Sequence, residues 1–162
     1  EVYTWGSFLQ SRMYAQGVTC SDCHEPHSQK LRAPGGEVCL GCHQATKYQN
    51  AEHHHHKPGS SGSECIACHM PGRDYMVIDN RRDHSLRIPR PDLAESIGAP
   101  DACTSCHRDR KPAWAASKLR DWFGSTPVGL QRYAEVLHDG DIRAAGARKR
   151  LLEFAQNHGH QR

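Results

Sequence analysis

Four copies of one short pattern constrain this chain more than any other feature. Each copy is Cys-x-x-Cys followed at once by His, and the copies together account for all eight cysteines of the 162 residues. The cysteine pairs are Cys20 and Cys23, Cys39 and Cys42, Cys65 and Cys68, and Cys103 and Cys106. The gaps between successive copies are 14, 21 and 33 residues, too short to wrap each copy in its own domain. We therefore expect neighbouring copies to lie close together.

The repeated pattern predicts covalent attachment of c-type haem. Two thiols about one helical turn apart can join the two vinyl groups on one porphyrin edge, and the histidine that follows turns beneath the iron. Zinc sites and disulfide frameworks also use paired cysteines, but neither explains a histidine after every pair. We expect four haem c groups held by the eight cysteines, with these proximal iron ligands: His24, His43, His69 and His107.

The composition fits a fold whose interior is filled by cofactors. Hydrophobic residues make up 36% of the chain and the mean hydropathy is −0.79, so a core built from side chains alone would be thin. Between Val18 and Arg110 no helical or strand period is sustained outside the four copies. The predicted fold class is mostly irregular and α, a haem-cored multihaem cytochrome with little β and a C-terminal helical appendage.

Residues typical of helix starts and helix ends occur near both ends of the chain. A helix is expected over residues 4–15, and three more are expected in the tail. The first of these runs from Pro112 to Gly124, the second from Thr126 to Gly140, and the third begins at Asp141. The predicted domains are a tetrahaem cytochrome domain over residues 1–110 and a helical segment over 111–162, either a hairpin or the start of a HEAT-like repeat.

The second ligand of each iron decides what such a chain can do. An iron with two strong protein ligands is a low-spin electron carrier, whereas an open iron can bind a substrate. One or two ligands are expected from the histidine run at 53–56, and His84 is expected to serve the third or fourth haem. Met13 is either a ligand or a core residue of the first helix, and His27 is either a ligand or a loop residue. The candidate distal ligands are therefore His27, His54, His55, His56, His84 and Met13.

Cofactor chemistry also bears on location and partners. Because c-type haem is attached outside the cytoplasm, we expect a periplasmic or extracellular protein of the cell envelope. Residues 1–8 lack a basic start and an apolar run, so we expect a mature chain without its export signal, or a fragment. No stretch approaches eighteen apolar residues, so no transmembrane segment is expected. Haem propionates shift the formal charge of +3 to about −1 in the ferric state, so no nucleic-acid partner is expected.

Several segments resemble a known family. They are Trp5 to Ser11, Gly17 to His24, the histidine run, Tyr75-Met76-Val77, and Arg82 to Ser85 with Ile88 to Pro91. These segments resemble the multihaem cytochrome region of bacterial proteins that join doubled Cys-x-x-Cys-His motifs to HEAT or TPR repeats. The resemblance covers roughly residues 1–124 and implies respiratory or extracellular electron transfer. In many multihaem cytochromes the position that matches Met13 looks like a distal histidine, so this chain departs from the pattern there.

Three classes of function follow from these features. The leading prediction is an electron carrier, not an enzyme, that relays electrons through closely packed low-spin haems to redox partner proteins or other copies of itself. The second is a subunit of a conductive cytochrome filament or respiratory complex. The third is a multihaem reductase of nitrogen or sulfur oxyanions, which would require an iron with an open face.

Overall fold

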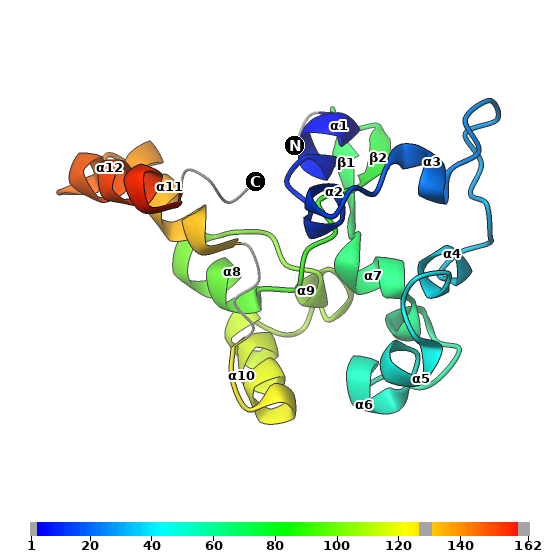
Figure 1. The fold of residues 1–162 in the computed structure, drawn as a ribbon. Coiled ribbons are helices and arrows are strands. Elements are labelled where there is room, and N and C mark those ends of the chain that lie inside the picture. Colours follow the sequence, from blue (N-terminus) through cyan, green and yellow to red (C-terminus); the bar gives the residue numbers. More distant parts are fainter. Residues whose placement is uncertain (1–2, 127–130, 159–162) are drawn as a thin grey trace. The chain divides into compact units, whose positions relative to one another are not determined.

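The chain folds into short helices joined by long irregular segments. The computed structural model describes residues 3–126 and 131–158. Two compact units divide the chain, Glu1–Arg87 and Ile88–Arg162. The sheet among the described residues has two strands (Figure 1). The predicted class, mostly irregular and α with little β, is confirmed, while the predicted domain boundary at residue 110 stays a prediction.

The N-terminal segment forms two short helices in place of the single helix predicted over residues 4–15. Helix α1 spans Thr4–Phe8 and α2 spans Arg12–Ala15. The break arises at Ser11, which is buried and whose hydroxyl accepts a hydrogen bond of 3.0 Å from the backbone N–H of Tyr14. Such a serine satisfies a free N–H at a helix start, so a new helix begins there. Gly17 follows α2 with a φ of +86°, as expected for a helix-terminating glycine.

The rest of the first unit consists of single helical turns and one hairpin. The short helices are α3 (Cys20–Cys23), α4 (Glu37–Leu40), α5 (Ala45–Tyr48), α6 (Ala51–His54), the 3-10 helix η1 (Ser61–Ser63) and α7 (Cys65–His69). Helices this short have little stability of their own. Their conformation therefore depends on what they pack against.

A β-hairpin, which was not expected from the sequence, follows the third Cys-x-x-Cys-His copy. Strand β1 (Gly72–Tyr75) pairs antiparallel with β2 (Asp79–Arg82), so that Gly72 lies opposite Arg82. The guanidinium of Arg82 donates hydrogen bonds of 3.3 and 3.2 Å to the carbonyls of Ile66 and Met70. These hydrogen bonds attach the hairpin to α7. The second strand thereby leads the chain back toward the third Cys-x-x-Cys-His copy. Because its strands show no alternation of buried and exposed apolar residues, sequence periodicity gave no signal for it.

The second unit contains the fourth copy and the longer helices. Its elements are α8 (Pro91–Ile97), α9 (Cys103–Cys106), α10 (Pro112–Phe123), the 3-10 helix η2 (Gln131–Tyr133), α11 (Ala134–Asp141) and α12 (Ala147–His158). The predicted helix from Pro112 to Gly124 is confirmed, with Gly124 as a left-handed cap at φ +71°. The predicted start of the next helix at Thr126-Pro127 falls partly on residues 127–130, which lie outside the described residues.

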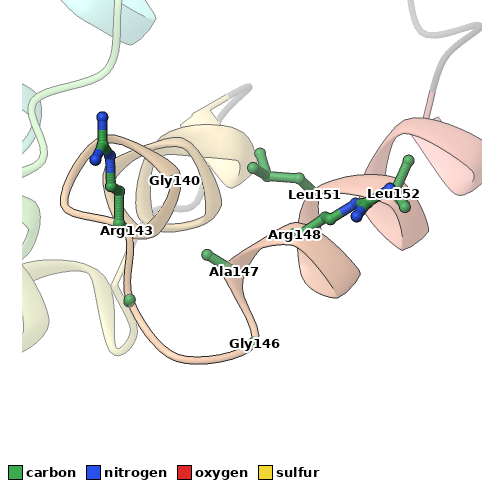
Figure 2. A pocket seen from close by; sticks show the side chains of 8 residues that line it. Gly140, Arg143, Gly146, Ala147, Arg148, Leu151 and Leu152 are labelled. Carbon is green, nitrogen blue, oxygen red and sulfur yellow. The ribbon is translucent and has the colours of Figure 1, made fainter.

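The prediction that Asp141 begins the last helix is wrong. Asp141 ends α11, and a loop through Arg143 and Gly146, both with left-handed φ values, leads to α12. Gly140 permits the two helices to approach, because a Cβ atom there would lie 2.8 Å from a methyl carbon of Leu151. Figure 2 shows the Leu151 side chain extending toward Gly140 beside a cavity of about 540 Å³.

Buried apolar side chains are few in the described residues. Those with the least exposure are Phe8, Leu93, Ala115, Ala116 and Ala147. Three of these five are alanines, which bury little area and therefore contribute little hydrophobic stabilisation. The small number of buried apolar side chains agrees with the thin side-chain core expected from the composition.

A partly buried ion pair at the start of α8 generates a pH-dependent prediction. The Arg90 guanidinium contacts the Asp92 carboxylate at 2.6 Å, with side chains 12% and 24% exposed. Burial alone would raise the pKa of Asp92, but the hydrogen bonds and charge of Arg90 outweigh it and hold the pKa below its ordinary value. The pair therefore stabilises the fold above the ordinary pKa, and its contribution is lost as pH falls through the depressed folded pKa.

We expect Asp92→Asn to lower the free energy of unfolding by about 1–3 kcal/mol at pH 7. The variant and the parent should converge as pH falls through the depressed pKa of Asp92, because the parent carboxyl then becomes protonated. Urea unfolding followed by far-ultraviolet circular dichroism measures both values. Asp109→Asn is the matched control, since the Asp109–Arg110 pair is 71% and 55% exposed and should contribute less than about 1 kcal/mol. A loss at pH 7 that stays the same when pH is lowered past the depressed pKa of Asp92 would contradict the assignment.

Candidate haem sites

Three of the four Cys-x-x-Cys-His copies place both cysteines in one helical turn. The helices are α3 for the first copy, α7 for the third and α9 for the fourth. The histidine N–H donates to the carbonyl of the first cysteine at 2.8 Å for His24 and at 2.9 Å for His107. One turn places residues i and i+3 on the same side of the helix. This local geometry brings the two thiols to one side, as attachment to one porphyrin edge requires.

The second copy departs from the helix expected to carry its cysteines. Helix α4 contains Cys39 but ends at Leu40, so Cys42 lies two residues beyond it. Gly41 is the C-terminal cap, and hydrogen bonds to the Cys39 carbonyl continue the turn, from the N–H of Cys42 at 3.2 Å and from that of His43 at 2.9 Å. A tighter i→i+3 bond is common where a helix ends. Cys42 therefore follows Cys39 by a hydrogen-bonded turn, although it is not part of the helix.

Two of the other turns are capped by an aspartate. Asp22 accepts hydrogen bonds from the backbone N–H of Thr19 at 2.7 Å and from its hydroxyl at 2.9 Å. These bonds hold the pKa of Asp22 below its ordinary value. Asp101 accepts from the backbone N–H groups of Cys103 and Thr104 at 2.7 and 2.9 Å. A carboxylate at a helix start satisfies free N–H groups, so these aspartates fix the turns that carry the cysteines.

The eight cysteines, all of them among the described residues, are thiols that form no disulfide. Those of Cys20, Cys42 and Cys106 are exposed, and the other five are half-buried. Within residues 3–126 and 131–158, no group of three or more His, Cys, Asp or Glu side chains is arranged to hold a bare metal ion. None of the eight cysteines is therefore fully buried. This matters because the cysteine thiol is the group that adds to a haem vinyl.

Two pairs of histidines have ring centroids a little more than 6 Å apart and ring planes inclined by 29° or less. His24 of the first copy stacks with His84 at 6.4 Å between ring centroids and 29° between planes. His69 of the third copy stacks with His53 at 6.2 Å and 12°. Two imidazoles on opposite faces of one iron, each nitrogen about 2 Å from the metal, have centroids roughly 6 Å apart. Both pairs are thus separated by the distance that one haem iron between the rings would need.

Backbone carbonyls fix the tautomer of three of these four imidazoles. The Nδ1 atoms lie 3.0 Å from the carbonyl oxygen of Gln29 for His24, 2.9 Å from that of Arg87 for His69, and 3.0 Å from that of Arg82 for His84. A carbonyl can only accept, so each Nδ1 carries the proton and each Nε2 keeps its lone pair. A second partner of this kind is what orients a metal-binding histidine. The rings are therefore prepared to bind iron through Nε2.

The histidine run at 53–56 divides into different roles. The backbone N–H of His56 donates to Nδ1 of His54 at 3.1 Å, which places the His54 proton on Nε2 and disfavours that atom as a ligand. Nδ1 of His56 instead donates to the carbonyl of His54, leaving Nε2 of His56 with its lone pair. His55 adopts a left-handed conformation with φ +53° and ends α6. The run therefore turns sharply, so its members point in different directions.

His53 belongs to the run from which one or two ligands were expected, although it was not named individually as a candidate, and the structure places its ring beside that of His69. It lies in α6, where the amide oxygen of Asn50 accepts from its backbone N–H at 3.0 Å. Burial, followed by the neighbouring His69, lowers the pKa of His53, which favours the neutral form that binds metals. The Asn50 helix cap is the sequence signal that could have placed His53 inside a short helix, with His55 and His56 after its end.

The other two proximal histidines pack against aromatic rings. His43 lies edge-on to Tyr48 at 5.5 Å between centroids and 84° between planes. His107 lies 5.0 Å from the ring centroid of Trp114 in α10, tilted by 57°. These contacts hold both imidazoles beside apolar surface, as expected next to a porphyrin.

The remaining candidates lie in loops or short helices. His27 is exposed, and its backbone N–H donates to the Glu25 carboxylate at 3.1 Å. Met13 is half-buried in α2, directly before the first copy, and its carbonyl accepts from Val18 at 3.1 Å. His84 was expected on the third or fourth haem, but the structure places it beside the histidine of the first copy.

Comparison with known proteins bears on the first two copies above all. Residues 13–48, which contain them, match the family model described as Doubled CXXCH motif. No curated protein matches the chain. Among solved structures, the crystal structure of the outer cell wall cytochrome OcwA is similar at 24% identity and a TM-score of 0.47, covering 80% of this chain and 31% of that one. The chain therefore spans less than a third of the length of that cytochrome. Separately, the Cys-x-x-Cys-His motifs support a multihaem c-type cytochrome.

The position of His56 depends on a glycine. A Cβ atom at Gly62 would lie 2.7 Å from Cγ and 2.9 Å from Nε2 of the His56 ring. We expect Gly62→Ala to displace this imidazole and to destabilise the haem-loaded protein by about 1–3 kcal/mol, as other overpacked sites do. Thermal unfolding followed at the haem Soret band measures the effect.

Gly6→Ala provides the control, because nothing lies within 4 Å of a Cβ atom there and Gly6 belongs to α1. That change should leave the protein as stable as the parent or more stable by up to about 1 kcal/mol. If Gly62→Ala unfolded at the same temperature as Gly6→Ala, the close packing of His56 on Gly62 would be refuted.

Proposed function

We propose that this chain is an electron-transfer cytochrome that carries four haem c groups and works outside the cytoplasm, in the cell envelope or beyond it. Its partners are redox proteins that donate and accept electrons. The haem iron supplies the one-electron chemistry. The chain's own residues hold each haem by two thioethers and one proximal histidine, and at two sites they supply a second imidazole.

One observation carries the proposal, namely the two parallel imidazole pairs. His24 with His84, at 6.4 Å, and His69 with His53, at 6.2 Å, provide a ligand for each face of the first and third irons. Occupation of both faces excludes small substrates from those irons and favours the low-spin state in both oxidation states. Little then has to move when an electron arrives or leaves. Such sites are suited to electron transfer and unsuited to catalysis on a bound substrate.

Membrane association enters the proposal only through partners. Among the residues described, no helix combines the length and apolar character needed to cross a membrane. The chain would meet its donor and acceptor by transient contact, since electron-transfer proteins bind one another through small interfaces.

The ligand pairs make a direct spectroscopic prediction. In the oxidised, haem-loaded protein we expect low-temperature EPR to show low-spin ferric haem. His53→Ala and His84→Ala should each convert one haem, about a quarter of the total, to the high-spin state by removing its second imidazole. His54→Ala is the matched control from the same histidine run, because the hydrogen bond at its Nδ1 disfavours ligation, and it should leave the EPR spectrum unchanged.

Two results would count against the proposal. The first is high-spin haem in the parent protein that accounts for most of the iron. The second is turnover of nitrite, hydroxylamine or sulfite by the parent protein at rates above those of free haem, which would indicate an open catalytic iron.

The number of haems gives an independent test. We expect a pyridine haemochrome assay to find four haems per chain. Replacing both Cys65 and Cys68 by serine should lower the number to three, because the third haem then loses both covalent bonds. A parent value of two, with the cysteines of the other copies still reactive toward alkylating agents, would contradict the four-haem assignment.

A further inference from the structure

The second and third Cys-x-x-Cys-His copies contact each other at two separate places. One contact joins the cysteine side of the two copies, and the other links His43 of the second copy through Tyr48 to His53, the histidine beside His69 of the third copy. Close contact at both places bears on how the two haems influence each other. Interactions between charges strengthen as distance and local dielectric fall.

The first contact lies between α4 and α7. The Sγ atom of Cys65 lies 3.3 Å from the place where a Cβ atom on Gly36, the residue before α4, would stand. Burial, followed by the nearby Cys65 thiol, raises the pKa of Cys39 to about 11. The first cysteine of the second copy therefore faces the first cysteine of the third, and the porphyrin edges that these cysteines bind would lie side by side.

The second contact is made by Tyr48 at the end of α5. Its ring lies edge-on to His43 of the second copy at 5.5 Å and edge-on to His53 at 5.3 Å, with interplanar angles of 84° and 85°. His53 in turn stacks on His69 of the third copy. Edge-to-face packing of this kind is favourable and fixes ring orientation. Tyr48 therefore orients the imidazole of the second copy, His43, and that of His53, which lies beside the histidine of the third copy.

We propose that the second and third haems form a coupled pair, and that Tyr48 is the positioning residue that links their axial histidines. This inference rests on the proposed function and adds to it the order of the haems in space. A change of charge on either iron is felt at the other, because both the thioether side and the axial side of the two sites are in contact. Tyr48 acts through His43 and His53 and does not bind iron itself.

The test uses the haem-loaded chain and low-temperature EPR of the fully oxidised state. First, His53→Met and His84→Met identify the signals of the third and first haems, because each replaces one imidazole by a thioether and changes one signal. Second, Tyr48→Leu removes the ring between His43 and His53. We expect the signal of the third haem and one other signal to shift together, while the signal of the first haem stays where it is in the parent.

Two comparisons separate coupling from general loosening of the fold. Tyr14→Leu removes a ring that packs against Trp5 and Phe8 and should shift none of the signals. Gly36→Ala places a methyl group 3.3 Å from the Cys65 sulfur and should shift the same two signals as Tyr48→Leu. Gly41→Ala, in the same turn as Cys39, puts a Cβ atom 3.4 Å from the carbonyl of Val38 and should not.

Failure of the inference is distinguishable from failure of the proposed function. If His53→Met changes a single haem but Tyr48→Leu shifts one signal or none, the ligand pairing holds and the coupled pair is refuted. A shift of the first haem's signal by Tyr48→Leu would also refute it. If neither His53→Met nor His84→Met changes a haem signal, the ligand pairing that supports the proposed function fails.

Discussion

Hydrogen bonds from imidazole Nδ1 to backbone carbonyls are the interaction on which the candidate sites depend. His24, His69 and His84 each commit one ring nitrogen to the main chain, at 3.0, 2.9 and 3.0 Å. A histidine held in this way has one tautomer and one ring direction. In the first pair both rings are fixed in this way, whereas in the second pair only His69 is, and His53 is positioned by its helix α6. Side-chain packing alone would not hold rings about 6 Å apart.

The ligand pairs also explain how so polar a chain maintains a fold. His24 and His84 lie on opposite sides of the third copy in sequence, and the hairpin attached to α7 by Arg82 delivers His84 to its place. An iron bound by both would close a loop of about 60 residues, which removes conformational entropy from the unfolded chain. Haems bound in the proposed way would supply both the apolar interior and the long-range links that the few buried apolar side chains do not.

Sequence predicted what is local and did not predict what is distant. Most of the Cys-x-x-Cys-His turns and the helix from Pro112 to Gly124 are set by residues close in sequence, so both were expected from the chain. Cys42 is the local exception, because the helix of its copy ends early at Leu40. The association of His84 with the first copy depends on a hairpin without alternation, which leaves no periodic signal. The helix expected from Asp141 does not begin there, because α11 runs through Asp141 and is followed by a loop in which Arg143 and Gly146 have left-handed φ values.

The position of His84 sets an order in which the sites are completed. The ribosome makes the N-terminal residues first, so the first copy emerges from it before the others. Its facing histidine, however, comes 60 positions after His24, beyond the third copy and the whole hairpin. The third copy has its partner, His53, already in place when His69 emerges. A chain interrupted near residue 80 would therefore contain both histidines of the third pair, His53 and His69, but would lack His84, the second histidine of the first pair.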